Sequence, residues 1–290
     1  MNAGSPVRTL QFNDNTSIQL IPNTYVYKIL FVVEGKVRIA IGGKSCVVEP
    51  YSLAIFSNLH EHSISAQEAP YVRYFLCLVP SEVDLLIRDP KLLAPFRNPI
   101  SPDHILDVSN MLPVVYAFFD ELENEVKRSD EYSDQVIRCL LYRFLVEVYR
   151  NNSSKFPQIN SETQLRMYEI EKYIDAHFLE RIQIREVAES FFVSPGYLAH
   201  CFKSCVGYTP MQYLMLNRLS YARELLRQVD MPIGVVAFRS GFSDVNNFMK
   251  SFKKRYGITP KTARLGDPHF QELRPRTHGF VEDAVHSSGY

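Results

Sequence analysis

Residues 202–210 read Phe-Lys-Ser-Cys-Val-Gly-Tyr-Thr-Pro, and residues 252–260 read Phe-Lys-Lys-Arg-Tyr-Gly-Ile-Thr-Pro. The two stretches share five of nine positions and lie fifty residues apart. Each copy closes the same local pattern, which is a short helix, a sharp turn and a second helix that stops at a glycine. Two such units in tandem predict a DNA-reading domain.

The charge of the chain is concentrated around these repeats. The 290 residues carry no formal net charge, but residues 163–265 hold 15 Lys+Arg against 9 Asp+Glu, a net of +6. Residues 1–162 hold 15 against 19, and residues 266–290 hold 2 against 4. Positive charge attracts polyanions because binding releases their counterions. On charge alone, a basic surface without a partner is an equally good interpretation.

The first predicted unit places a short helix near Ile184 and Val187 ahead of a second helix that starts after Ser194. Ser194 is a good N-cap, and Pro195 suits the first helical position because its missing N–H would lack a partner there. Helical spacing predicts that Leu198 and Phe202 face inward. The outer face then carries small and polar residues, which are Gly196, Ala199, His200 and Lys203.

The second unit repeats this pattern with different side chains. Gly241 and Phe242 form the turn, and Asp244 caps the next helix. The outward positions are Val245, Asn246, Asn247, Lys250, Lys253 and Lys254. An asparagine can read adenine and a lysine can reach guanine or phosphate, while the basic cluster at 253–255 would position the protein on phosphates.

Residues 212–226 form one amphipathic helix between the units. Such a helix can hold the two units at a fixed separation, so that both second helices enter successive major-groove turns about 34 Å apart.

Residues 165–265 resemble the C-terminal DNA-binding domain of the AraC/XylS family of bacterial transcription regulators. The matching positions are Arg218, Ala222, Leu225, Leu226, Ile233, Val236, Ala237, Gly241, Phe242, Ser243, Asp244, Phe248, Phe252, Lys253, Gly257, Thr259 and Pro260. The resemblance implies two helix-turn-helix units whose second helices enter the major groove. The predicted DNA-binding set is Pro195, Gly196, Ala199, His200, Lys203, Val245, Asn246, Asn247, Lys250, Lys253 and Lys254.

The first unit departs from an ordinary reading helix. Pro195, Gly196 and Ala199 offer little hydrogen-bonding reach. Sequence readout there would rest on His200 and on backbone or shape contacts. The second unit, rich in Asn and Lys, carries most of the predicted direct readout.

The first hundred residues predict β structure. Strand-like runs at residues 25–33, 37–41, 46–48, 53–56 and 71–78 alternate with Gly and Pro breaks, which is typical of a small barrel or sandwich. Residues 34–37 and 56–62 resemble a cupin-like sensing domain, although Tyr51-Ser52 replaces the usual Gly-Asp.

A histidine-rich stretch raises an alternative function. His60, Glu61 and His62 could belong to a metal-dependent cupin enzyme with an attached DNA-binding module. No further histidine follows before His104, and no phosphate loop or nucleophile elbow occurs. We therefore predict no enzyme activity, no catalytic residue, no metal and no cofactor.

Two predicted helices follow. Leu106, Met111, Val115, Phe118 and Leu122 recur at helical spacing, and a second helix runs over residues 133–149. These helices could pair with another copy of the chain as a homodimer or simply cover the barrel. Residues 151–161 are polar, contain a proline and predict a flexible linker.

The five cysteines support an intracellular location. Their number is odd, and they lie in apolar runs without a Cys-x-x-Cys pair, at Cys46, Cys77, Cys139, Cys201 and Cys205. Neither a secretory signal nor an apolar run of about eighteen residues occurs. We expect a cytoplasmic bacterial protein that associates with the nucleoid when bound to DNA and does not contact membranes.

The sequence thus predicts an α+β chain of two domains joined by a linker. The expected parts are a cupin-like sensing barrel (1–103), a helical hairpin (104–150), a linker (151–162), an all-α domain with two helix-turn-helix units (163–265) and a flexible tail (266–290). The expected function is a sequence-specific transcription regulator that binds promoter DNA. The family resemblance implies recruitment of RNA polymerase as a partner, and therefore favours an activator over a repressor. Its N-terminal domain would respond to a small-molecule or protein effector, or the regulator would work without a ligand.

Overall fold

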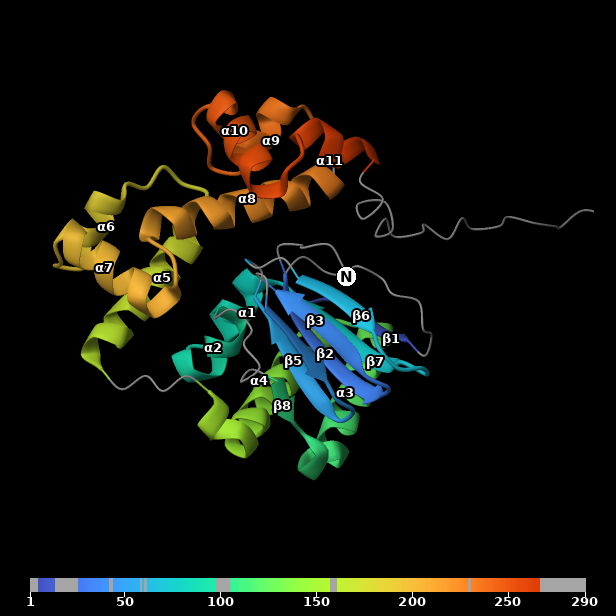
Figure 1. The fold of residues 1–290 in the computed structure, drawn as a ribbon. Coiled ribbons are helices and arrows are strands. Elements are labelled where there is room, and N and C mark those ends of the chain that lie inside the picture. Colours follow the sequence, from blue (N-terminus) through green and yellow to red (C-terminus); the bar gives the residue numbers. More distant parts are fainter. Residues whose placement is uncertain are drawn as a thin grey trace, which may run out of the picture.

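The computed structural model describes residues 5–13, 26–41, 44–57, 59, 62–97, 105–156, 161–228 and 231–266. A β-rich N-terminal part is followed by helices that continue to the end of the described chain (Figure 1). The predicted fold class, β-rich in its first part and all-helical at its C-terminus, is confirmed. The predicted tail lies outside the described residues apart from Gly266.

Two antiparallel sheets form the N-terminal part. The larger sheet has the order β1 (Val7–Asn13), β7 (Val72–Leu78), β2 (Tyr27–Glu34), β5 (Ser52–Phe56) and β8 (Ile105–Asp107). The smaller sheet has the order β4 (Lys44–Val48), β3 (Val37–Ile41) and β6 (His62–Ala66). Side chains from both sheets, among them Leu30, Ile39, Phe56 and Phe75, meet in one apolar interior.

The alternation of strand residues explains the two faces of the larger sheet. Leu30 and Val32 of β2 point into the interior between the sheets, whereas Ile29 and Phe31 point to the outer face. Because both faces are buried, β2 is apolar almost throughout.

Some elements differ from the predicted ones. Strands β1, β6 and β8 and the helices α1 (Pro80–Leu86) and α2 (Pro90–Arg97) were not predicted. Leu106, which helical spacing assigned to a helix, is instead a buried residue of β8 that pairs with Leu53. Three residues of strand cannot establish a periodicity, so the sequence pattern could not separate them from the helix that follows.

The helices α3 (Leu112–Arg128) and α4 (Ser133–Asn152) cover the outer face of the larger sheet (Figure 1). The ring of Phe119 stacks on Phe31 of β2 with centroids 5.9 Å apart, and Phe118 stacks on Phe144 of α4 at 3.9 Å. The hairpin therefore does cover the sheet, which was one of the two predicted roles. Cys139 on α4 is exposed and the other four cysteines are half-buried, so none of them is fully buried although all lie in apolar runs of the sequence.

The segment predicted as a linker is ordered in its first part. Helix α4 continues to Asn152, a 3-10 turn spans Ser153–Lys155, and Phe156 is buried against Tyr149. Residues 157–160 lie outside the described part, and the next helix begins after Ser161. None of the described helices has the length and apolar content needed to cross a membrane.

The histidine stretch can be followed at one residue, because His60 and Glu61 lie outside the described part. The ring of His62 stacks on Phe56, and its Nε2 lies 3.5 Å from Nζ of the fully buried Lys28. A lysine ammonium at that distance repels a metal cation. Among the described residues, no three His, Cys, Asp or Glu side chains gather as a metal site would require.

A buried arginine joins the two parts of the chain. Arg97 of α2 forms ion pairs with Asp84 of α1 at 3.2 Å and with Glu171 and Asp175 of the first C-terminal helix at 3.4 and 3.1 Å. The hydroxyl of Tyr213 also donates a hydrogen bond to Asp175 Oδ1 at 2.9 Å. Removing one partner of such a buried cluster leaves an uncompensated charge, which typically costs about 3–5 kcal/mol.

This cluster predicts a pH-dependent stability. Burial, opposed by Arg97, raises the pKa of Asp175 from 3.8 to about 8, and burial also raises the pKa of Glu171. Between pH 3.8 and about 8, Asp175 therefore carries a proton in the folded state that it has lost in the unfolded state. Stability must fall as the pH rises through this window, by at most about 1.4 kcal/mol per pH unit for one group.

We expect Asp175→Asn to flatten that slope, since Asn keeps the Oδ1 acceptor but does not titrate. The measurement is the free energy of unfolding from urea titrations at several pH values between 5 and 8. Asp120→Asn, at an exposed position of α3, is the matched control and should retain the wild-type slope. Equal slopes for wild type and Asp175→Asn would contradict the assignment.

Candidate DNA-binding site

Seven helices make up the C-terminal part of the described chain. They are α5 (Glu162–His177), α6 (Ile184–Ser190), α7 (Pro195–Val206), α8 (Pro210–Gln228), α9 (Ile233–Arg239), α10 (Val245–Tyr256) and α11 (Pro260–Gly266). Figure 1 shows α8 as a long helix with α6 and α7 near one end and α9–α11 near the other. Each group has its own apolar core, one around Phe202 and Leu198 and one around Phe248 and Phe252.

Both second helices begin and end as predicted. The side chain of Ser194 accepts a hydrogen bond from the Tyr197 N–H, and that of Asp244 accepts from the N–H groups of Asn246 and Asn247. Each helix then stops at a glycine in the left-handed conformation, Gly207 with φ 86° and Gly257 with φ 74°. The local sequence therefore determines both ends of α7 and α10.

The repeated signature has a structural role. Phe202 and Phe252 are fully buried and anchor α7 and α10 to their cores. The threonine that follows each glycine starts the next helix: Thr209 Oγ1 accepts from the Gln212 N–H, and Thr259 Oγ1 accepts from the Thr262 N–H. The signature thus ends one helix and begins another, and only its lysines, Lys203, Lys253 and Lys254, belong to the predicted DNA-binding set.

Most of the predicted DNA-binding residues lie on the outside of α7 and α10. The exposed ones are Pro195, Gly196, His200, Lys203, Asn246, Asn247, Lys250, Lys253 and Lys254. Ala199 is half-buried, and Val245 is half-buried against the second core. The structure therefore brings these residues together in two groups, one on each second helix.

Two exposed residues were missed by the sequence reasoning. Tyr197 lies on α7 with its hydroxyl 3.2 Å from Thr163 Oγ1, and Met249 lies on α10. Met249 follows Asn246 by three residues and precedes Lys253 by four, so helical spacing could have placed it on their face. An apolar side chain on a helix is more often part of a core, so residue type alone does not indicate its exposure.

Arg255 forms a contact within the protein, whereas its neighbours Lys253 and Lys254 are exposed. Its Nη2 donates a 2.8 Å hydrogen bond to the carbonyl oxygen of Leu59, in the N-terminal part of the chain. The basic cluster at 253–255 therefore offers two exposed lysines, and its arginine is used in a contact between the two parts.

The two units are joined by a tight contact around Arg218 of α8. Its Nε donates to the carbonyl oxygen of Phe178 at 2.7 Å, and its Nη2 donates to that of Glu180 at 2.6 Å. Gly241, in the turn of the second unit, adopts φ 83° and lies against this site. A Cβ there would approach Phe178 O to 2.7 Å and Arg218 Nε to 2.8 Å, so only glycine fits.

Comparisons with known proteins agree with this arrangement of two helix-turn-helix units. The family model described as a helix-turn-helix domain matches residues 187–265. The C-terminal domain is an AraC-type DNA-binding domain. The similarity to AraC-family regulators extends beyond this domain, over 83% of the chain.

Two relatives show how far the similarity extends. The HTH-type transcriptional activator RhaS of Escherichia fergusonii is 30% identical over 165 residues, which span 57% of this chain and 58% of that protein. RhaS of Escherichia coli O1:K1 / APEC is 26% identical over 247 residues, which cover 83% of each chain. The first alignment thus spans little more than half of its relative.

The arrangement of both parts resembles a solved structure. ToxT from Vibrio cholerae matches 87% of this chain and 97% of its own, with a TM-score of 0.54 and 16% identity. This likeness concerns the fold, in which a β-rich N-terminal part precedes two helix-turn-helix units.

The glycines of this AraC-type domain provide a graded test of its packing. Gly241→Ala should lower the free energy of unfolding by roughly 2–5 kcal/mol, because overpacking of about 1–3 adds to backbone strain of about 1–2. Gly257→Ala meets no atom within 4 Å and should cost only the strain. Gly196→Ala has neither penalty and should change stability by about 0.5 kcal/mol or less. Urea unfolding measures all three, and equal losses would contradict the tight contact at Gly241.

Proposed function

We propose that this protein is a sequence-specific transcription activator that binds promoter DNA through α7 and α10. The observation that carries the proposal is the pair of capped helices, each with an exposed outer face, fixed to the single helix α8. In helix-turn-helix proteins the second helix lies in the major groove and its N-terminal residues contact base edges. Activation is favoured over repression because RhaS carries that description.

The two reading helices have unequal tasks in this proposal. Asn246 and Lys250 of α10 offer direct hydrogen bonds to base edges, and Lys253 and Lys254 reach phosphates. Among the predicted DNA-binding residues of α7, only His200 and Lys203 carry polar groups with reach, so the first unit reads shape and backbone in addition to one base. The second unit therefore supplies most of the base discrimination.

The N-terminal part is the proposed place of control, by an effector or by a partner protein. It touches both units through one residue, because the side chain of Leu59 packs into the core of the first unit and its carbonyl oxygen accepts from Arg255 of α10. An event that moves the segment around Leu59 would therefore act on a reading helix directly. The ion pairs of Arg97 and one between Arg8 and Glu224 of α8 support the same coupling.

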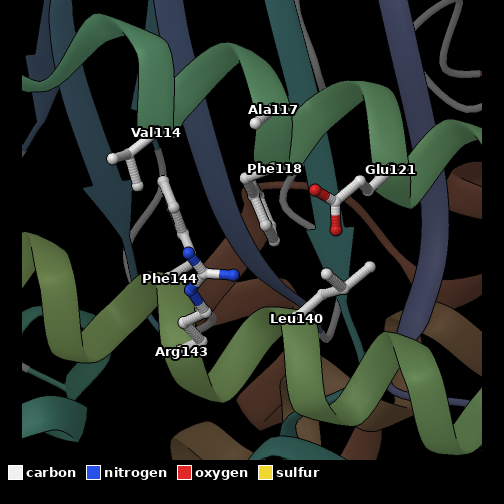
Figure 2. A pocket seen from close by; sticks show the side chains of 7 residues that line it. All are labelled: Val114, Ala117, Phe118, Glu121, Leu140, Arg143 and Phe144. Atoms are coloured by element: carbon white, nitrogen blue, oxygen red, sulfur yellow. The ribbon is translucent and has the colours of Figure 1, made fainter.

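The α3–α4 hairpin is the proposed surface for a second copy of the chain. Helix α4 exposes Val136 and Tyr142 in part. Figure 2 shows the side chains that line a pocket between the helices, where Phe118 of α3 and Leu140 of α4 extend toward the facing helix. We place the protein in the bacterial cytoplasm, on promoter DNA and in contact with RNA polymerase, without a catalytic role.

Substitutions in α10 test the proposal. Asn246→Ala and Lys250→Ala should each weaken binding to a promoter fragment found by genomic mapping, by roughly 1–3 kcal/mol per lost base contact. A lysine that binds a phosphate contributes about one unit to the slope of log affinity against log salt concentration. Lys250→Ala should therefore make that slope shallower by about one unit only if Lys250 binds a phosphate. We therefore expect Asn246→Ala to leave the salt slope unchanged.

Gel-shift titrations at several salt concentrations measure both quantities. Lys127→Ala on α3 is the control, because it removes an exposed lysine far along the chain from α10. The assignment of α10 as a reading helix fails if a double variant with both Asn246→Ala and Lys250→Ala binds the promoter with wild-type affinity and selectivity.

A further inference from the structure

One large apolar side chain lies among the polar side chains on the outside of α10. Met249 is 41% exposed, whereas its neighbour Phe248 is fully buried. Val245, one helical turn earlier, packs against the core of the second unit, but Met249 does not belong to either core of the described C-terminal domain. The packing of the fold therefore does not account for an apolar residue at this position.

The repeat of the two units relates Met249 to a position of the predicted DNA-binding set. Helices α7 and α10 are both 12 residues long, and their N-caps, Ser194 and Asp244, lie fifty residues apart, as do the glycines that end them. Position 249 of α10 is therefore equivalent to position 199 of α7. Ala199 belongs to the predicted set, and the same register extends that set to Met249.

Spacing along α10 relates Met249 to the polar residues beside it. Asn246 precedes it by three residues and Lys253 follows it by four, so the three side chains lie on one side of the helix. A rise of about 1.5 Å per residue puts Met249 about 4.5 Å beyond Asn246 along the helix axis. Successive base pairs of DNA are about 3.4 Å apart. A side chain at position 249 can therefore reach a base pair one or two steps from the adenine that Asn246 is proposed to read.

We propose that Met249 reads the 5-methyl group of a thymine within about two base pairs of that adenine. The base edges in the major groove present hydrogen-bond donors and acceptors, and the thymine methyl is the one apolar substituent among them. A flexible thioether side chain can pack on that methyl group and exclude water from it. This inference rests on the proposed DNA-binding function and adds a specificity-determining residue that discriminates by apolar contact.

Replacing single thymines with uracil tests this contact, because uracil keeps the base pair and the O4 acceptor and lacks only the methyl group. We expect one such replacement in the half-site bound by α10 to weaken wild-type binding about fourfold in gel-shift titrations, the effect of losing one buried apolar carbon. Met249→Ala should bind the thymine fragment at least about fourfold more weakly than wild type and should bind the thymine and uracil fragments with equal affinity. Its salt slope should be that of wild type, because no charge is removed.

Met211→Ala is the matched control, since Met211 is another exposed methionine, at the start of α8 and outside both reading helices. It should keep the wild-type difference between thymine and uracil fragments. The inference is overturned if Met249→Ala remains as sensitive to uracil as wild type, or if wild type responds to uracil at no position of that half-site. If wild type does not distinguish the promoter from unrelated DNA, the proposed function fails as well. Weaker binding by Asn246→Ala without any effect of uracil refutes the thymine contact alone.

Discussion

The contact between Arg218 and the backbone around Phe178 holds the DNA-binding domain together. One guanidinium in the middle of α8 donates to two carbonyl groups just after the end of α5, and the turn of the second unit packs onto the same place at Gly241. Two small cores that would otherwise be joined by one helix alone are thereby fixed to each other. A DNA-binding domain needs this rigidity, because the spacing of its reading helices must match the spacing of major-groove turns.

Local sequence predicted this domain well because its helix ends are local events. Ser194, Asp244, Gly207 and Gly257 cap or stop their helices through contacts within four residues, so composition and spacing suffice to find them. The faces of α7 and α10 followed from helical periodicity for the same reason. The fate of Arg255 could not be predicted, since its partner Leu59 lies 196 residues away.

The N-terminal part was harder to predict for physical reasons. Its longer strands were found from apolar runs, but β8 has three residues and gains its place only from pairing with β5. Burial of Arg97 also depends on tertiary structure, because the three carboxylates around it come from α1 and α5. The same contacts connect the N-terminal part to α5, the first helix of the C-terminal domain.

The central claim is that α8 and Arg218 present α7 and α10 to DNA as one rigid pair. The most direct measurement is promoter affinity as the two half-sites, located by footprinting, are moved apart by about five base pairs, half a helical turn. A rigid pair predicts that affinity falls to the level of a fragment with the second half-site alone, since one helix then faces the wrong side of the duplex. Affinity that is unchanged by the insertion would contradict the account.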